Sequence, residues 1–202
     1  MKKESQPTRG RRRGFDRDEA VDMAMRLFWR HGYEGVSIND LTGAMGIAPP
    51  SLYAAFGTKA DLYREALQRY TDRPETQFHP EPRGTLAETI RHLLETAADA
   101  VTSPDGETGC MVSTGLLACG EAHVDLAQEV AAIRKGMHPQ LVALLKRWLA
   151  PRNAQATATY LLTLMQGMAI QARDGAGRAT LQQTIEISLS GLPGNQAAKS
   201  DA

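Results

Sequence analysis

The sequence predicts an all-α fold made of two helical domains. Apolar residues recur at helical spacing in one segment after another, and no segment shows the apolar–polar alternation of a β-strand. The stretch 72–84, with three prolines and little periodicity, predicts the domain boundary. A chain of 202 residues, 42% of them hydrophobic, is long enough for one compact unit or two small ones with a shared core.

The charge of the chain is unevenly distributed, although the formal net charge is zero. Residues 1–14 hold six lysines and arginines against one glutamate, a net charge of +5, so the remaining residues carry −5. This stretch has no apolar periodicity, which predicts a disordered basic arm. Taken alone, such an arm is as consistent with a solvated tail as with a DNA-binding segment. Beside a DNA-binding motif, it favours contact with the DNA backbone or minor groove.

Cysteine content and hydropathy favour a cytoplasmic protein. Two cysteines, Cys110 and Cys119, are too few for a disulfide scaffold and suit a reducing compartment. The basic N-terminus is followed by no apolar run, which argues against a signal peptide. No stretch approaches the roughly 18–20 apolar residues of a membrane span, so we expect no membrane partner.

The first helix is expected from about residue 16 to Gly32. Acidic Asp16 and Asp18 suit the positive end of its dipole, and an i, i+3, i+4, i+7 pattern of apolar residues predicts one buried face. That face consists of Ala20, Met23, Ala24, Leu27 and Phe28.

Two short helices joined by a tight turn are expected next. Ser37 and Asp40 form a capping pattern for the first of them. Gly46 supplies the positive φ that a sharp turn requires, and Pro49 and Pro50 suit the first turn of the second helix. Small residues dominate the exposed side of that helix, so it is slim enough for a DNA major groove.

A fourth helix completes the first domain, residues 15–71. Thr58 is its expected N-cap, and it ends near Thr71 before the boundary segment. Its apolar face consists of Leu62, Tyr63, Ala66, Leu67 and Tyr70.

The second domain, residues 85–192, is expected to be a succession of helices. Thr85 caps the first, which extends to about Val101. After a loop, the apolar run from Cys110 to Cys119 is predicted to be helical.

Three longer helices follow in this second domain. The first contains Pro139, which is expected to kink or split it. Apolar residues cover more than one face of the next, residues 154–173, which predicts burial on several sides. The last helix spans about 178–191, and residues 193–202 are a predicted disordered tail.

The first 70 residues resemble the TetR family of bacterial transcriptional repressors. The resemblance is carried by residues 25–67, MRLFWRHGYEGVSINDLTGAMGIAPPSLYAAFGTKADLYREAL. It is specific because a whole string of landmarks recurs at the family spacing, although Thr42 stands where the family usually has alanine. The landmarks are Phe28, Gly32, Tyr33, Leu41, Gly46, Leu52, Tyr53, Phe56 and Lys59.

The second half is similar to the family in its helical length and order, and residues 109–120 and 164–176 look like one branch of it. The resemblance implies a C-terminal domain that holds a small-molecule pocket and forms a homodimer through its last two helices. It therefore implies a repressor that binds a palindromic double-stranded operator and leaves it when an unidentified effector binds. It implies no cofactor.

The resemblance also implies which residues meet DNA. The Tyr53 hydroxyl should reach a phosphate and Lys59 the backbone, although Tyr53 could instead be a core residue. The reading face lacks Arg, Gln and Asn, so thymine-methyl contacts and DNA shape should share the specificity. The expected DNA-contacting residues are Ser37, Asn39, Pro49, Pro50, Ser51, Tyr53 and Lys59, with Arg11, Arg12 and Arg13 in the minor groove.

Candidate effector-pocket residues are polar or soft side chains that interrupt apolar helical surfaces. Each of them is more often ordinary core or interface, and methionine is a gap-filler first. The candidates are His92, Thr96, Cys110, Ser113, Trp148, Met165 and Gln166, followed by Met111, Thr114 and Met168.

The cysteines raise the alternative of a thiol- or metal-responsive repressor of the same fold. Nine residues turn a helix through roughly 900°, so Cys110 and Cys119 would lie on opposite faces of one straight helix and not share an ion. Cys119 and His123 are four residues apart, but Gly120 is expected to break the helix between them. Copper(I) held by Cys110 and Met111 remains compatible with the sequence. Inert buried thiols are the simpler interpretation, and no structural zinc spacing is present.

Two other function classes are disfavoured. The sequence contains no Gly-rich phosphate loop, H-E-x-x-H or G-x-S-x-G, so we expect no enzyme. The second class is a constitutive DNA-binding protein without an effector. Such a protein would need its second half only for dimerisation, and the large apolar second half of this chain exceeds that need.

Overall fold

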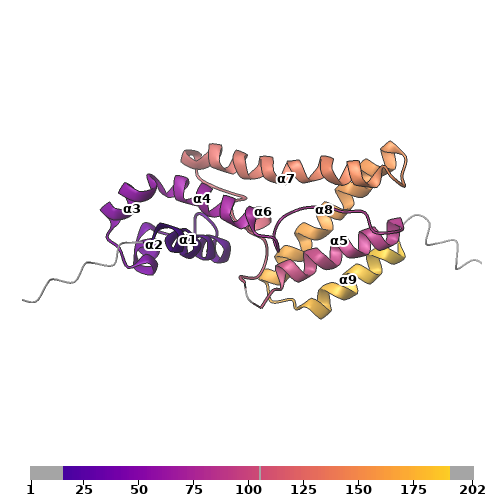
Figure 1. The fold of residues 1–202 in the computed structure, drawn as a ribbon, viewed down its shortest axis with the longest axis horizontal. Coiled ribbons are helices and arrows are strands. Elements are labelled where there is room, and N and C mark those ends of the chain that lie inside the picture. The colour runs from indigo at the N-terminus through magenta and orange to yellow at the C-terminus, as the bar shows by residue number, and fades with distance from the viewer. Residues whose placement is uncertain (1–15, 105, 192–202) are drawn as a thin grey trace, which may run out of the picture.

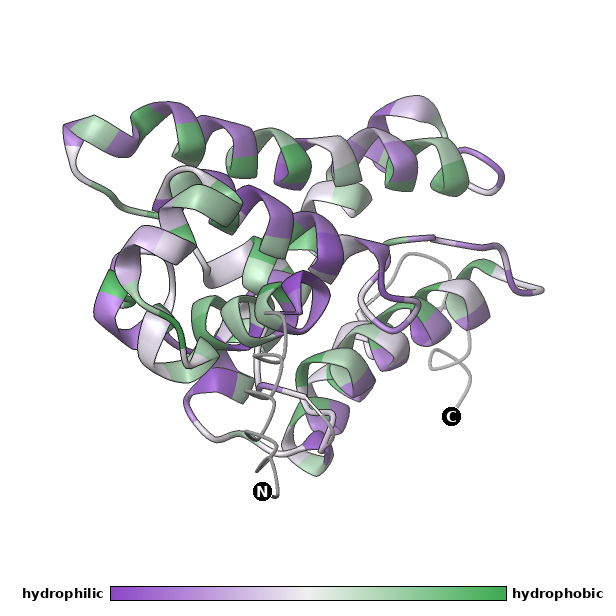
Figure 2. Ribbon diagram, turned by 60° about the vertical axis from the view of Figure 1, so that its left-hand side comes forward, coloured by the Kyte–Doolittle hydropathy of each residue, from purple (hydrophilic) through white to green (hydrophobic). Residues whose placement is uncertain are grey.

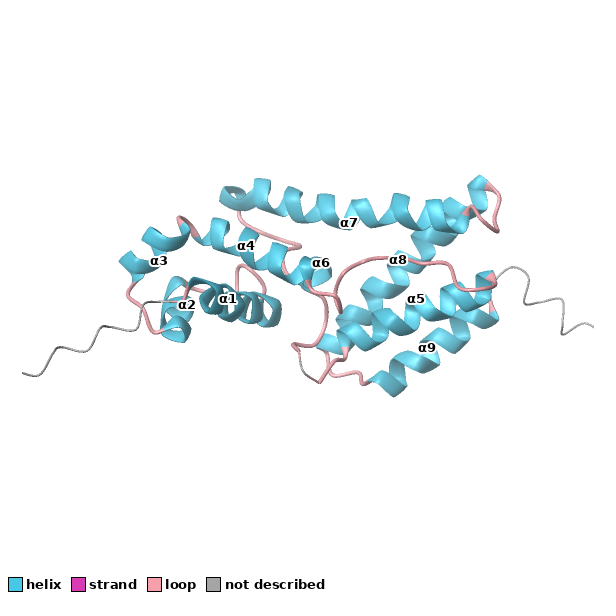
Figure 3. Ribbon diagram, in the orientation of Figure 1, coloured by secondary structure: helices cyan, strands magenta, loops and turns pink. Residues whose placement is uncertain are grey.

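The computed structural model describes residues 16–104 and 106–191, and every regular element within these ranges is a helix (Figure 3). The predicted all-α fold is therefore confirmed. The predictions for the basic arm, including its three consecutive arginines, and for the C-terminal tail lie outside the described residues. In chain order the elements are α1 (Arg17–His31), α2 (Ile38–Met45), α3 (Pro49–Phe56), α4 (Lys59–Asp72), α5 (Leu86–Val101), α6 (Met111–Thr114), the 3₁₀ turn η1 (Glu121–His123), α7 (Val124–Leu145), α8 (Pro151–Arg173) and α9 (Arg178–Ser190).

The helices form two groups that lie end to end (Figure 1). Helices α1–α4, here called the head, are at one end, and α5, α8 and α9, here called the body, are at the other. Helix α7 extends along both groups, and α6 lies where they meet. Green and purple residues alternate along α7 in Figure 2, as expected of a helix with one face on a core.

Local hydrogen bonds determine where the helices of the head begin and end. At α2, the Ser37 hydroxyl donates to the Asp40 carboxylate (2.6 Å) and accepts the Asp40 amide N–H (3.1 Å), so the predicted cap is present. Equivalent capping boxes start α4 and α5. Gly46 ends α2 in the left-handed conformation with φ 66°, and Pro49 and Pro50 occupy the first turn of α3.

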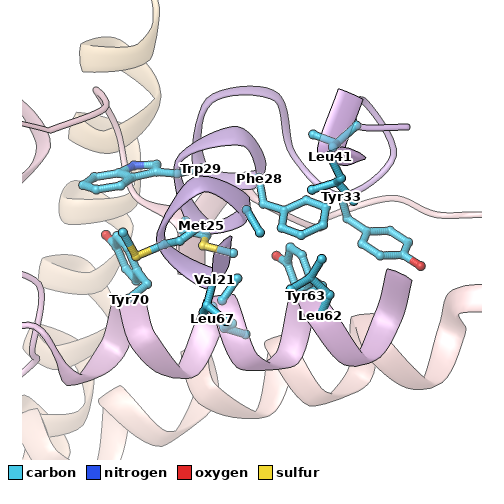
Figure 4. Close-up of a cluster of buried hydrophobic side chains, with 14 of the residues drawn as sticks. Val21, Met25, Phe28, Trp29, Tyr33, Leu41, Leu62, Tyr63, Leu67 and Tyr70 are labelled. Atoms are coloured by element: carbon cyan, nitrogen blue, oxygen red, sulfur yellow. The ribbon is translucent and has the colours of Figure 1, made fainter. Parts of the chain in front are cut away.

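Two hydrophobic cores hold the molecule together. The first fills the head and also includes α6 and the start of α7, through residues such as Met111 and Leu126. Its centre is aromatic (Figure 4): the Phe28 and Tyr63 rings meet edge to face at 5.0 Å, and the Tyr33 and Tyr63 rings do so at 5.2 Å. The second core joins α5, α8 and α9 to the C-terminal half of α7. The boundary segment thus separates two groups of helices, whereas the first core draws on both halves of the chain.

The prediction of one helix from Cys110 to Cys119 is wrong, because only Met111–Thr114 is helical. The Gly115 carbonyl accepts the Tyr33 amide N–H (2.8 Å) from the head. The Gly115 carbonyl is thus satisfied by a distant backbone amide and not by a helical hydrogen bond. The apolar content of the segment could not reveal this contact.

Pro139 does not split α7, which is continuous over 22 residues. Proline removes one backbone donor, which leaves the carbonyl of Lys135 without its helical partner. Lys135 and Pro139 are both exposed, so water can reach this part of the helix. The Gln140 side-chain amide also donates to the neighbouring Gly136 carbonyl (3.2 Å).

Helices α8 and α9 keep an apolar surface in the single chain. Leu161 and Ala169 are buried as expected, but Tyr160 and Ile170 of α8 are nearly half exposed, and Ile187 of α9 is 73% exposed. Burial of α8 on several sides is thus only partly achieved within one chain. Among the described residues, none of the helices has the length and apolar character needed to cross a membrane.

Candidate DNA-reading surface and effector cavity

Helix α3 is fixed to the head by one apolar face and presents the other to solvent. Leu52 and Phe56, four residues apart, are buried in the first core. The opposite face is exposed, and Tyr53 on it is 50% exposed, which rules out the alternative that Tyr53 is a core residue. The expected DNA-contacting residues on this surface are Pro49, Pro50, Ser51 and Tyr53 on α3, with Asn39 and Ser37 at the start of α2, and all of them are exposed.

The Ser37 hydroxyl is already engaged in the cap of α2. It donates to the Asp40 carboxylate and accepts from the Asp40 backbone N–H. Hydrogen bonds from the Ser37 hydroxyl and the Ser37 backbone N–H to the carboxylate hold the pKa of Asp40 below its usual value. Ser37 thus orients the N-terminus of α2. The neighbouring Asn39 side chain is exposed beside it.

Lys59 is the first residue of α4, which follows α3, and its side chain lies against an aromatic ring. Its Nζ lies 4.3 Å from the centroid of the Tyr33 ring, a cation–π distance. Partial burial lowers the pKa of Lys59, and the nearby carboxylates of Glu34 and Asp40 oppose that effect. The ring therefore helps to fix the position of the ammonium group.

Many guanidinium groups of α1 and α4 are already paired with carboxylates. The Glu107 carboxylate accepts two hydrogen bonds from Arg30, and this pairing raises the pKa of the arginine. The pairs have closest N···O distances of 2.6–2.7 Å and are Arg17–Glu65, Arg30–Glu107, Arg64–Glu129 and Arg69–Asp18.

A cavity of about 140 Å³ lies between α5 and α8. A single water needs only about 10–15 Å³ by the same measure. The segment before α5 covers one side of the cavity, and Tyr70 and Cys110 lie at the end nearest the head. The cavity-facing residues of α5 are His92, Leu93, Thr96, Ala97, Ala100 and Val101, and those of α8 are Leu162, Met165 and Gln166.

Six of the seven principal pocket candidates face this cavity, and Trp148 does not. Met137 of α7 reaches the cavity, but α7 continues for eight residues to Leu145, roughly 12 Å along its axis, and Trp148 lies beyond that end. Its ring instead lies near the Arg147 guanidinium, 5.8 Å from the ring centroid. Met111 and Met168 are buried in the two cores. The candidates brought together are His92, Thr96, Cys110, Ser113, Met165 and Gln166.

Sequence reasoning missed the contribution of the boundary segment. This segment was expected only to link the domains, but Phe78, His79 and Pro80 line the cavity. The signal was a single aromatic residue, Phe78, among prolines and charged residues. A half-buried Phe78 packs against the second core, which gives the segment a fixed place over the opening.

The two cysteines are free and do not share a helix. Cys110 faces the cavity and packs against both cores, whereas Cys119 packs against the first core only. Cys110 and Cys119 therefore do not lie on opposite faces of one straight helix. Gly120 precedes the turn η1, so no helix joins Cys119 to His123. Within residues 16–104 and 106–191, no three His, Cys, Asp or Glu side chains are arranged to hold a metal ion.

Residues 109–115 connect the cavity to the head. The Trp29 indole N–H donates to the Gly109 carbonyl (3.1 Å) at a buried site, and the Tyr33 amide donates to the Gly115 carbonyl (2.8 Å). Cys110 and Ser113, which face the cavity, lie between these two anchor points.

Arg173, at the end of α8, ties the body to the end of α1. Its guanidinium donates to the carbonyls of Trp29 (2.6 Å) and Arg30 (2.7 Å), and also to the Thr114 hydroxyl (2.5 Å). These carbonyls belong to the last turn of α1, where a positive charge is favourable. No local pattern in the sequence predicts this contact between segments more than 140 residues apart.

Comparison with known proteins gives consistent matches. Residues 20–66 match the family described as bacterial regulatory proteins, tetR family. The HTH-type transcriptional repressor ComR of Escherichia coli K12 is 34% identical over 196 residues, which cover 90% of this chain and 91% of ComR. The HTH-type transcriptional repressor BdcR of the same strain is 31% identical over 82% of this chain and 83% of BdcR.

A solved structure extends the likeness to a DNA complex. It contains the TetR family transcriptional regulator CifR, with cysteine substitutions, bound to a 26-base-pair double-strand operator. Its TM-score to this chain is 0.79 and its sequence identity is 32%, over 91% of this chain and all of that one.

Proposed function

The chain belongs to the TetR family of bacterial regulatory proteins, and from that premise we propose that it is a repressor controlled by a small-molecule effector. It is a DNA-binding transcriptional regulator and not an enzyme. In the proposed cycle, a homodimer binds a palindromic operator and leaves it when the cavity between α5 and α8 is filled.

The exposed apolar side chains of α8 and α9 support the dimer. Tyr160, Ile170 and Ile187 would be covered by the same face of a second copy, which removes apolar surface from water. A two-fold pair presents two copies of α3 in opposite orientations, and a palindromic DNA site has the same symmetry.

The exposed face of α3 supports DNA reading in the major groove. Small side chains leave room for close approach, and Pro49, Pro50 and the nearby alanines offer apolar contacts to thymine methyls. In this proposal Tyr53 donates to a phosphate and Lys59 adds a backbone contact. Many arginines of α1 and α4 are paired with carboxylates, so the basic arm is the main remaining source of positive charge for the minor groove.

The observation that carries effector control is the continuity between the cavity and α1. A ligand that displaces Cys110 or Ser113 would move residues 109–115, whose carbonyls hold Trp29 and Tyr33 of the head. A ligand that binds one arrangement of this segment better than the other shifts the balance between operator-binding and released states.

The test begins with selection of genomic DNA fragments by the purified full-length chain. We expect enrichment of one discrete site with inverted repeats, and protection of both half-sites in a footprint. Thermal unfolding against a panel of metals, oxidants and hydrophobic compounds then finds ligands of the folded state, because such ligands raise the melting temperature. Failure to enrich any discrete sequence would refute the proposed function.

The position of Cys110 in the cavity wall favours one second candidate, a repressor of this fold that responds to thiol oxidation or a soft metal such as copper(I). It predicts that Cys110→Ser abolishes release of the operator by oxidant or metal. Cys119→Ser, outside the cavity, is the matched control. Unchanged responses in both variants would exclude this candidate.

A further inference from the structure

The walls of the cavity indicate which chemical class of effector it accepts, an inference that rests on the proposed function. We propose that the effector is a small, uncharged and mainly apolar molecule with a single hydrogen-bonding group. Carboxylates, phosphates and alkylammonium ions of similar size are excluded.

The apolar part of the ligand has matching walls on both sides. Leu93 and Ala97 of α5 face Leu162 and Met165 of α8 across the cavity, and Phe78 of the covering segment adds an aromatic surface. Burial of apolar ligand surface against such walls is favourable in proportion to the area removed from water. An apolar chain is therefore the main source of binding energy in this site.

An anion would find no compensating charge in the cavity. None of the described residues that line it is a lysine or arginine, and its two histidines, His79 and His92, are exposed to solvent. Arg73, near its mouth, is paired with Glu75, and Arg173 is engaged with carbonyls of α1. A buried carboxylate or phosphate without a cation loses its hydration without replacement, which is costly.

A cation is disfavoured for the corresponding reason. The carboxylates of the lining, Glu75 and Glu81, are on exposed residues of the covering segment, and each has an arginine partner. A backbone hydrogen bond and the hydrogen bond from Arg73 lower the pKa of Glu75, so it is ionised at pH 7 and paired with a cation. Apart from these two carboxylates and the exposed His79 and His92, the described side chains that line the cavity carry no ionised group at pH 7.

Several neutral polar side chains line the cavity, and two of the half-buried ones, on Ser113 and Gln166, are available to orient a ligand. The Ser113 hydroxyl and the Gln166 side-chain amide are both half-buried in the cavity wall. Within the part of the chain that the structure describes, neither has a hydrogen-bonding partner for its side chain. One alcohol, amide or carbonyl group of a ligand would satisfy them without any change in charge.

The test uses four six-carbon probes that differ only in their end group: 1-hexanol, hexanamide, hexanoate and hexylamine. Thermal unfolding of the full-length protein is followed with each probe at pH 8. We expect hexanol and hexanamide to raise the melting temperature at concentrations at least tenfold lower than the two charged probes. In an operator-binding assay, the neutral probes should release the DNA at correspondingly lower concentrations.

Variants of Gln166 should change the preference among the probes in opposite, predictable ways. Gln166→Leu should weaken hexanamide binding about fivefold, because it removes the amide partner. Gln166→Arg supplies the missing cation and should reverse the preference, so that hexanoate binds more tightly than hexanol. Thr163→Ala is the matched control, because Thr163 is exposed on the same helix and does not line the cavity.

Equal or tighter binding of hexanoate or hexylamine by the natural chain would overturn the inference. So would the absence of any melting shift with the neutral probes. Thermal unfolding needs no DNA, so the ligand class is tested even if operator selection fails. Conversely, a protein that selects an operator but prefers hexanoate would retain the proposed function and lose only this inference.

Discussion

The head and the body of this protein are packed in different ways. The head core is built around aromatic rings in edge-to-face contact, and Phe28, Tyr33 and Tyr63 are almost fully buried there. The second core consists of aliphatic side chains and alanines, such as Ala158 and Leu161, and leaves a cavity beside it. A surface that must match DNA benefits from rigid packing, whereas a domain that must admit a ligand needs space.

The largest expected difference concerns core truncation. Phe28→Ala should reduce the free energy of unfolding by about 3–5 kcal/mol, because the aromatic cluster cannot collapse around the missing ring. Leu162→Ala should cost about 2 kcal/mol, at the low end for leucine, because Leu162 already borders a cavity. Urea denaturation of both variants measures the two values. Equal losses would contradict the proposed contrast in packing.

Removal of the basic arm tests whether the head alone supplies the DNA affinity. Deletion of residues 1–13 should lower the slope of log K against log salt by about 0.9 for each phosphate that the arm neutralises, and by about 2.7 if three arginines contribute. Affinity near physiological salt should fall by one to two powers of ten. Operator titrations at several salt concentrations give the slope, and an unchanged slope would mean that the arm is only a solvated tail.

Arg173→Ala tests the connection between the two regions. It removes three hydrogen bonds from a charged donor and should lower the free energy of unfolding by about 2 kcal/mol. It should also raise the effector concentration needed for operator release. Arg91→Ala is the control, because its exposed pair with Glu186 should be worth only about 0–1 kcal/mol. Identical effects of the two substitutions would exclude a special role for Arg173.

Tyr53→Phe sharpens the distinction between reading and folding. Loss of the hydroxyl should weaken operator binding by about 1 kcal/mol, roughly fivefold. The free energy of unfolding should not change, because the side chain is half exposed and its ring is retained. A binding titration and a denaturation curve of the same variant separate the two effects. A loss of stability without a loss of affinity would assign Tyr53 a structural role.

The smallest expected effect is a gain in stability in α7. A Cβ at Gly136 would meet no atom within 4 Å, so Gly136→Ala should stabilise the helix by about 0.5–1 kcal/mol. Gly115→Ala provides the contrast in the segment that connects the cavity to the head. There the new Cβ would lie 2.4 Å from the Met111 carbonyl oxygen and 2.7 Å from the Tyr63 hydroxyl. Thermal melting should show a small increase for the first variant and a decrease for the second.

The sequence by itself determined the elements whose signals are local. The Ser37 cap, the Gly46 turn and the prolines of α3 depend on a few neighbouring residues, so the helices of the head could be predicted. Interrupted apolar faces also pointed to part of the cavity wall, including Cys110 and Gln166, because polar side chains on a core-facing surface require a reason.

The tertiary structure alone decided how distant segments meet. The helix expected after Cys110 ends at Thr114, where the Gly115 carbonyl bonds to Tyr33. Trp148 lies beyond the C-terminal end of α7, away from the cavity that Met137 reaches. The contact of Arg173 with α1 and the place of Phe78 over the cavity likewise join residues with no shared pattern. Such contacts depend on the relative positions of packed helices, and the periodicity of a single helix carries no information about its neighbours.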